Sequence, residues 1–151
     1  MNKLIMGVLL PLLFIALTAY AADNDGILGI WNNQEKDAQI EIFKCSDQYC
    51  GKIVWLKEPN YPEGSKDGVP GTPRRDHNNP DPKSRNNLIM GLEIVRGFTY
   101  GGESKWVGGK VYDPKNGKSY SGKMTLVSPN QLNLRGFIGI SLIGRTAIWT
   151  R

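Results

Sequence analysis

Residues 131–151 of this chain, QLNLRGFIGISLIGRTAIWTR, decide its fold. Apolar and polar side chains alternate along 132–135 and again along 147–150, which is the pattern of β-strands with one buried face. Glycines mark the bends of the backbone at Gly136, Gly139 and Gly144. The stretch therefore predicts a final hairpin whose second strand carries Trp149.

A strand that carries a Trp needs a partner, because burial of the indole ring stabilises a fold by a few kcal/mol. The best partner is the segment 26–31, GILGIW, which is short and apolar and ends in Trp31. Pairing of 26–31 with 146–151 would close the sheet and remove its open edges. We therefore predict an all-β fold, an antiparallel barrel of about eight strands, with an open sandwich as the alternative.

Residues 1–21 have the features of a secretory signal peptide. Lys3 gives a positive start, 4–17 are almost wholly apolar, and a small-x-small sequence ends at Ala21. We expect a signal helix that is cleaved near Ala21, and hence a periplasmic or secreted protein. A membrane anchor is the alternative, although the apolar run is short for a span and contains Pro11.

The remaining residues, 22–151, are expected to form one β-barrel domain. The chain has 19 Lys and Arg against 14 Asp and Glu, and only Lys3 of these lies in the signal, so the mature charge is 18 − 14 = +4. This balance favours anionic neighbours and is compatible with peripheral contact with an anionic membrane. The basic residues do not cluster with aromatic ones, and together with export this argues against nucleic acid as a partner.

Cys45 and Cys50 lie between two strand-like segments, 38–44 and 51–56. In an exported protein, a close and even pair of cysteines indicates a disulfide, here one that staples a hairpin across its turn. A metal or redox pair is the alternative. The spacing is not C-x-x-C and no His stands nearby, so the sequence favours the disulfide.

The middle of the chain contains further strands and one long loop. Additional strands are expected at 88–98, 105–112 and 119–127, with a tight turn at 113–117. Residues 59–86 hold six of the nine prolines and show no sustained apolar periodicity. Loops of this length are uncommon unless they act as lids or binding loops, and 81–85 is typical of a single helical turn.

Several short motifs follow one another in a characteristic order: Gly29-Ile-Trp31, Ile42-Phe-Lys-Cys45, Cys50-Gly-Lys-Ile53, Asn79-Pro-Asp-Pro82, Gly91-Leu92, Gly109-Lys-Val-Tyr-Asp-Pro114, Arg135-Gly-Phe-Ile-Gly139 and Gly144-Arg-Thr-Ala-Ile-Trp-Thr-Arg151. In this order they resemble an exported bacterial family called domain of unknown function 2147. The resemblance covers essentially the whole of 22–151 and implies a secreted, lipocalin-like barrel of the calycin type. It implies no settled activity.

The motif Gly29-x-Trp31 also resembles the start of a lipocalin, in which the Trp plugs one end of the barrel under a late Arg or Lys. This resemblance implies that Arg145 or Arg151 stacks on Trp31 by a cation–π interaction. With Trp149 on the last strand, these residues are the expected barrel closure.

A lipid-like or other small amphipathic molecule inside the barrel is our working hypothesis for the ligand, with 59–86 as the lid. Glycines at 108, 109 and 122 would leave space for it or only serve strand curvature. Arg135 would bind an acidic headgroup if its side chain points inward, and would stand in water otherwise. The candidate ligand-binding residues are Arg135, Tyr112, Trp55, Trp106, Tyr120 and Met124, of which the Trp residues have core packing as their alternative.

The sequence contains no recognisable catalytic constellation, metal cluster or cofactor motif. His77 is the only histidine and is best explained as a loop residue, while Asp76, Asn79 and Asp81 are best explained as turn caps. The alternative function is a structural or interaction protein of the envelope with a filled barrel, and a hydrolase-like enzyme comes third. A cavity of about 300 Å³ or more would favour the ligand hypothesis.

Overall fold

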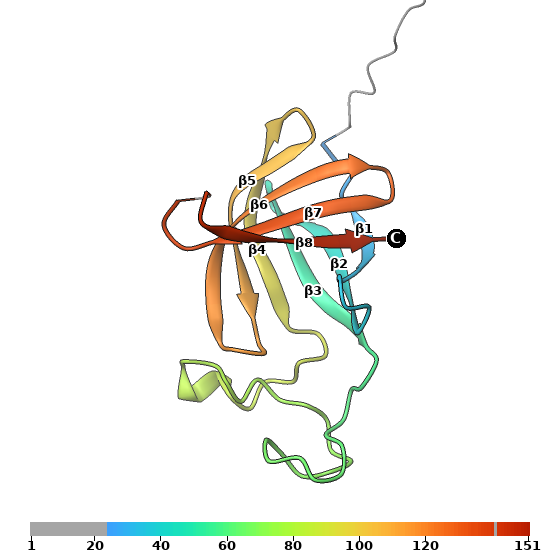
Figure 1. Cartoon of the computed structure of the whole chain (residues 1–151), viewed down its shortest axis with the longest axis vertical. Helices are drawn as coiled ribbons and strands as arrows, with labels where there is room; N and C mark the ends of the chain where they lie inside the picture. Colours follow the sequence, from blue (N-terminus) through green and yellow to red (C-terminus); the bar gives the residue numbers. More distant parts are fainter. Residues whose placement is uncertain (1–23, 141) are drawn as a thin grey trace, which may run out of the picture.

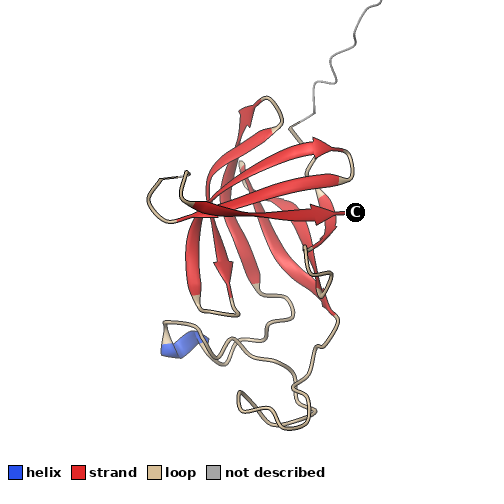
Figure 2. Cartoon of the chain, viewed as in Figure 1, coloured by secondary structure: helices blue, strands red, loops and turns tan. Residues whose placement is uncertain are grey.

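The computed structural model describes residues 24–140 and 142–151. The expected signal helix and its cleavage site lie outside these residues. Within them, eight antiparallel strands follow chain order around a closed barrel (Figures 1 and 2). The strands are β1 (Gly29–Asn32), β2 (Ala38–Cys45), β3 (Gln48–Leu56), β4 (Glu93–Gly102), β5 (Lys105–Asp113), β6 (Lys118–Ser128), β7 (Gln131–Phe137) and β8 (Gly144–Thr150). No helix in the described part of the chain is long and apolar enough to cross a membrane.

The predicted closure between the first and last strands is confirmed, and the contact is narrow. The backbone register pairs Asn32 of β1 with Thr150 of β8, and the Asn32 side-chain amide donates to the Thr150 carbonyl at 3.2 Å. Beyond this pair, the Ile148 amide donates to the Gln34 side chain at 3.0 Å. Because β1 has only four residues, side chains complete much of this seam.

Strands β2 and β3 form as their alternation predicts. Ile40 and Ile42 of β2 are buried, whereas Glu41 between them is half-buried and forms an ion pair with Lys52 of β3 at 3.3 Å. The predicted disulfide between Cys45 and Cys50 is present across the turn, with the two Cα atoms 5.9 Å apart. It joins the two strands at the end of the barrel where the chain enters β1.

The interior of the barrel is filled by large side chains. Among the described residues, the core side chains that are fully shielded from solvent are Ile27, Trp31, Val95, Phe98, Trp106, Met124 and Leu132. Gly109 and Gly122, which face each other across β5 and β6, lie against the Phe98 ring, and a Cβ at either position would overlap it. The expectation that these two glycines leave room for a ligand is therefore wrong, because Phe98 occupies the space that they create.

The long loop extends from 57 to 92, so it is longer than the predicted 59–86, and β4 begins at Glu93 rather than near 88. Contacts within the loop hold its backbone in one conformation. Isolated bridges join Asn60 to Pro73 and Arg75 to Leu88, and Tyr61 is 5% exposed inside the loop. The predicted helical turn is present as η1 (Pro82–Ser84), with Asp81 as its N-cap.

Asp76 attaches this loop to the barrel. It is a fully buried charged residue, and both carboxylate oxygens are used: Oδ1 accepts from the Tyr112 hydroxyl and Oδ2 from the Asn79 amide, each at 2.7 Å. The neighbouring Asn78 amide donates to the carbonyls of Pro114 and Lys115 in the β5–β6 turn. The loop is therefore held against one end of the barrel, as Figure 1 shows.

Candidate functional site

The six predicted ligand-binding residues do not meet at one site. Trp106 and Met124 are fully buried in the packed core, and Trp55 is 43% exposed on the outside. Tyr112 binds Asp76 of the long loop. Tyr120 accepts a hydrogen bond at 3.1 Å from Asn116 in the β5–β6 turn. Their role in ligand binding stays a prediction, but they do not line a common cavity.

Arg135 lies on the outer face of β7, which is one of the two orientations that the sequence left open. Its neighbours Leu132 and Leu134 are buried, and in a strand the side chain between two inward residues points outward. The guanidinium donates to the Thr146 hydroxyl at 3.0 Å and to the Leu142 carbonyl at 3.2 Å. Arg135 thus links β7 to both the β7–β8 connection and β8 through hydrogen bonds.

The end of the barrel near β1 is plugged as the lipocalin resemblance implied. The guanidinium of Arg151 lies over the Trp31 ring, 4.2 Å from its centroid, and the Trp31 indole donates to the Ile27 carbonyl at 2.8 Å. Trp149 is also buried. Arg145, the other candidate for the stacking position, is exposed at the opposite end of β8.

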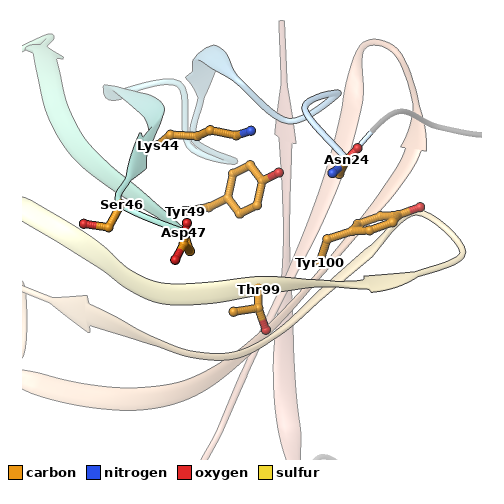
Figure 3. Close-up of a pocket in the computed structure, with 7 residues that line it drawn as sticks. All are labelled: Asn24, Lys44, Ser46, Asp47, Tyr49, Thr99 and Tyr100. Atoms are coloured by element: carbon orange, nitrogen blue, oxygen red, sulfur yellow. The ribbon is translucent and has the colours of Figure 1, made fainter.

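A pocket of about 390 Å³ opens at this plugged end (Figure 3). Residues from three parts of the chain surround it: the segment before β1, the β2–β3 hairpin and β4. They are Asn24, Lys44, Ser46, Asp47, Tyr49, Thr99 and Tyr100. The pocket lies outside the packed interior, and its opening faces solvent.

Aromatic rings form one side of the pocket. Tyr49 meets Trp106 edge-on with ring centroids 6.2 Å apart, and Tyr100 tilts against the same indole at 5.2 Å. The Trp106 indole donates to the Asn24 carbonyl at 3.2 Å, which holds the segment before β1 beside the rings. The arrangement offers an apolar surface that is anchored in the core.

Charged groups form the rim of the pocket. Lys44 binds the Asp25 carboxylate at 2.8 Å, and the Tyr49 hydroxyl donates to the same oxygen at 2.9 Å. The hydrogen bond from Lys44, followed by that from Tyr49, holds the pKa of Asp25 below its usual range. Burial, and then the bond to Asp25, raises the pKa of Tyr49. At neutral pH the rim therefore carries an ammonium group beside a carboxylate.

This pocket could not be predicted from the sequence. Tyr49 stands between the two cysteines and signals a hairpin rather than a binding site. It reaches Thr99 and Tyr100 because β3 pairs with β4 at Tyr49 and Phe98, and a long loop separates those strands in the sequence. No local pattern encodes that pairing.

In the described residues, no group of three or more His, Cys, Asp or Glu side chains is placed to hold a metal ion. His77 lies in the long loop, as expected. Its Nδ1 is 3.3 Å from the Arg75 carbonyl and its Nε2 is 3.6 Å from Asp67. Asn79 and Asp81 accept from the backbone amides of Asp81 and Lys83, in agreement with their predicted role as caps. Asp76 does not act as a cap, because its carboxylate accepts from the side chains of Tyr112 and Asn79 instead.

The closed meander of eight antiparallel strands, with an Arg-covered Trp at one end, defines a lipocalin-like β-barrel protein. Residues 29–151 match the model of a family described as an uncharacterized protein conserved in bacteria, DUF2147, and the chain belongs to that family.

A solved structure shares this architecture. It is described as protein HP1028 from the human pathogen Helicobacter pylori, which belongs to the lipocalin family. The two chains are 24% identical, with a TM-score of 0.67 over 82% of this chain and 81% of the other, and the likeness shows the fold. No curated protein matches the chain.

Proposed function

We propose that the mature protein is an exported, non-enzymatic binding protein for a small amphipathic molecule with an acidic group. We place the ligand in the pocket beside Tyr49 and Tyr100 rather than in the barrel interior. The observation that carries the proposal is a pocket of about 390 Å³ that combines aromatic walls with an ammonium group. Small-molecule sites have volumes of about 300–1,000 Å³, and the pocket falls within this range.

The packed interior is the reason for placing the proposed ligand in the end pocket. Phe98, Trp106 and Met124 fill the space that a lipocalin-type ligand would occupy, and displacement of well-packed side chains costs several kcal/mol. The end pocket needs no such displacement, because its rings are already in place.

Each side of the pocket suits one end of an amphipathic ligand. The rings of Tyr49 and Tyr100 give an apolar part a flat surface, and the Lys44 ammonium gives an acidic group a charge-assisted hydrogen bond. Lys44 now binds Asp25, so the ligand exchanges one carboxylate partner for another. Exchange leaves the Lys44 ammonium with a counter-charge, while Asp25 keeps the hydrogen bond from the Tyr49 hydroxyl.

Export is part of the proposal. A disulfide persists in oxidising compartments such as the bacterial periplasm, and the chain carries one between Cys45 and Cys50. The sequence of 1–21 has the features of a signal peptide. Intact-mass measurement of the protein recovered from its host should show the loss of 21 residues; retention of Met1 would indicate an anchored protein instead.

The binding proposal is tested by calorimetric titration of residues 22–151, which contain the whole described barrel. Fatty acids of increasing chain length and simple aromatic carboxylates are the probes. We expect saturable binding that falls about tenfold or more in Tyr100→Ala and in Lys44→Met. Lys52→Met is a matched control, because Lys52 is on the same hairpin and is also half-exposed and paired with a carboxylate.

Two results would contradict the proposal. If none of the probes binds saturably and native mass spectrometry of the host-derived protein shows no associated small molecule, the protein does not act through this pocket. If Lys52→Met weakens binding as much as Lys44→Met does, the effect is general electrostatics rather than a site.

An envelope protein that acts through its outer surface is the second candidate. The filled interior favours it, since a barrel whose core is packed with side chains has no internal space for a ligand. Apolar side chains exposed on the connection between β7 and β8 also favour it.

A further inference from the structure

The connection between β7 and β8 exposes four large aliphatic side chains: Ile138, 69%; Ile140, 59%; Leu142, 85%; and Ile143, 73%. We call these four residues the apolar tip. Figure 1 shows the connection between β7 and β8 at the side of the barrel, on the left of the view. Single exposed apolar side chains are ordinary, but a contiguous group of them marks an interaction surface.

The apolar tip does not serve the fold. The core is complete without it, because the interior is filled by side chains of the strands themselves. Connections between strands are usually polar, and here a glycine with φ of +79°, Gly139, is flanked by two isoleucines. The composition of the connection therefore calls for an explanation outside the barrel.

The backbone holds the tip in a defined shape. Arg135 donates to the Leu142 carbonyl at 3.2 Å and to the Thr146 hydroxyl, and the Ile143 amide donates to the Ile140 carbonyl at 3.2 Å. These bonds satisfy backbone polar groups within the connection.

Positive charge surrounds the tip. Residues 114–151 contain six Lys and Arg and no Asp or Glu. Lys123 of β6 stands opposite Arg135 of β7, and Arg145, which is exposed, stands opposite Gly136 beside the tip. An aliphatic tip flanked by basic side chains of β6, β7 and β8 is complementary to an anionic phospholipid surface, with acyl chains below phosphate groups.

We propose that the apolar tip inserts into the surface of an anionic phospholipid bilayer. Ile138, Ile140, Leu142 and Ile143 enter the boundary of the acyl chains, while Arg145 and Lys123 face the lipid phosphates. Arg135 is a positioning residue that shapes the connection. A protein partner is a poorer fit, because the centres of protein interfaces are enriched in Trp, Tyr and Arg, and the tip consists of aliphatic side chains alone.

Vesicle flotation tests the proposal with residues 22–151, so that the apolar segment 4–17 cannot contribute. The probes are vesicles of phosphatidylcholine alone and vesicles that contain a substantial fraction of phosphatidylglycerol. We expect binding to the anionic vesicles that weakens as salt is raised, and little binding to the neutral ones. Leu142→Asp should reduce the bound fraction at least tenfold, and Arg145→Gln should reduce it several-fold.

Ile138→Asp should reduce the bound fraction as Leu142→Asp does. Val69→Asp is its matched control, because both native side chains are 69% exposed and Val69 lies on the long loop. The control should bind like the wild type. An Ile143→Trp variant adds a readout of depth: its fluorescence should be quenched by lipids that are brominated in the acyl chain.

Three outcomes would overturn the proposal. The first is that the wild type and Leu142→Asp bind the anionic vesicles equally. The second is that Val69→Asp loses as much vesicle binding as Ile138→Asp does. The third is self-association of the wild type without vesicles that Leu142→Asp abolishes, which would make a second copy of the chain the occupant. None of these outcomes depends on the Tyr49–Tyr100 pocket, so the two proposals fail independently.

Discussion

The guanidinium of Arg151 covers the ring of Trp31, 4.2 Å from its centroid, and joins the two ends of the barrel sequence. The same group donates to the carbonyls of Gly26 and Leu28, at 2.9 and 2.8 Å, while its Nε donates to the Pro129 carbonyl at 2.8 Å. The backbone pairs β1 with β8 only at Asn32 and Thr150. One side chain therefore supplies three of the polar contacts that seal this end.

Arg151→Ala should destabilise the protein by about 2 kcal/mol, because it removes a cation–π contact and hydrogen bonds from a charged donor. Arg145→Ala, at the exposed end of the same strand, should change the stability by less than about 0.5 kcal/mol. Urea unfolding of both variants measures the difference. Equal urea midpoints for the two variants would show that the contacts of Arg151 add no stability beyond that of an exposed arginine.

Gly122→Ala should destabilise the barrel by about 1–3 kcal/mol, the usual cost of overpacking, because its new methyl group would overlap the Phe98 ring. Gly136→Ala is the control, since Gly136 stands opposite Gly122 in the register and its Cβ would meet Tyr120 at an ordinary contact distance of 3.5 Å. Thermal unfolding compares them. The destabilisation by Gly122→Ala should be smaller in a Phe98→Leu background, where the ring is absent. If the destabilisation is unchanged in that background, overlap with Phe98 is not its cause.

Asp76→Ala should loosen the long loop without unfolding the barrel. The change leaves the Tyr112 hydroxyl and the Asn79 amide without the acceptor that each now has at 2.7 Å. Loss of such partners costs about 1–3 kcal/mol. Hydrogen exchange should rise across 72–92 and remain low in β6 and β7. Asp81→Ala, which affects only the N-cap of η1, should raise exchange near 82–87 alone.

Alkaline pH should weaken the same attachment. Burial, and then the hydrogen bond to Asp76, raises the pKa of Tyr112 above its usual value of about 10. A group with a raised folded pKa contributes its full stabilisation below the unfolded pKa and loses it as the pH rises toward the folded value. Stability should thus decline above about pH 10. The decline should be smaller in Tyr112→Phe; an identical decline in both proteins would assign it to other groups.

The fold could be predicted from local patterns. A side-chain period of two identifies strands because successive residues of a strand face opposite sides, and this pattern located β2, β5, β6, β7 and β8 to within a few residues. The end of the barrel could be predicted from Trp31 and a late arginine. The disulfide followed from close spacing, since two cysteines that flank a hairpin turn are brought together by the hairpin itself.

The candidate site could not be predicted in this way, because it depends on contacts between distant segments. Alternation states that Leu134 and Arg135 face opposite sides, and only the closed barrel decides that Leu134 is the inward one. Glycines at 109 and 122 indicate missing volume, and only the packing shows that Phe98 fills it. The pairing of β3 with β4 across the 57–92 loop brings Tyr49 beside Tyr100. Strand pattern is a property of neighbouring residues, whereas the filling of a closed interior depends on all eight strands at once.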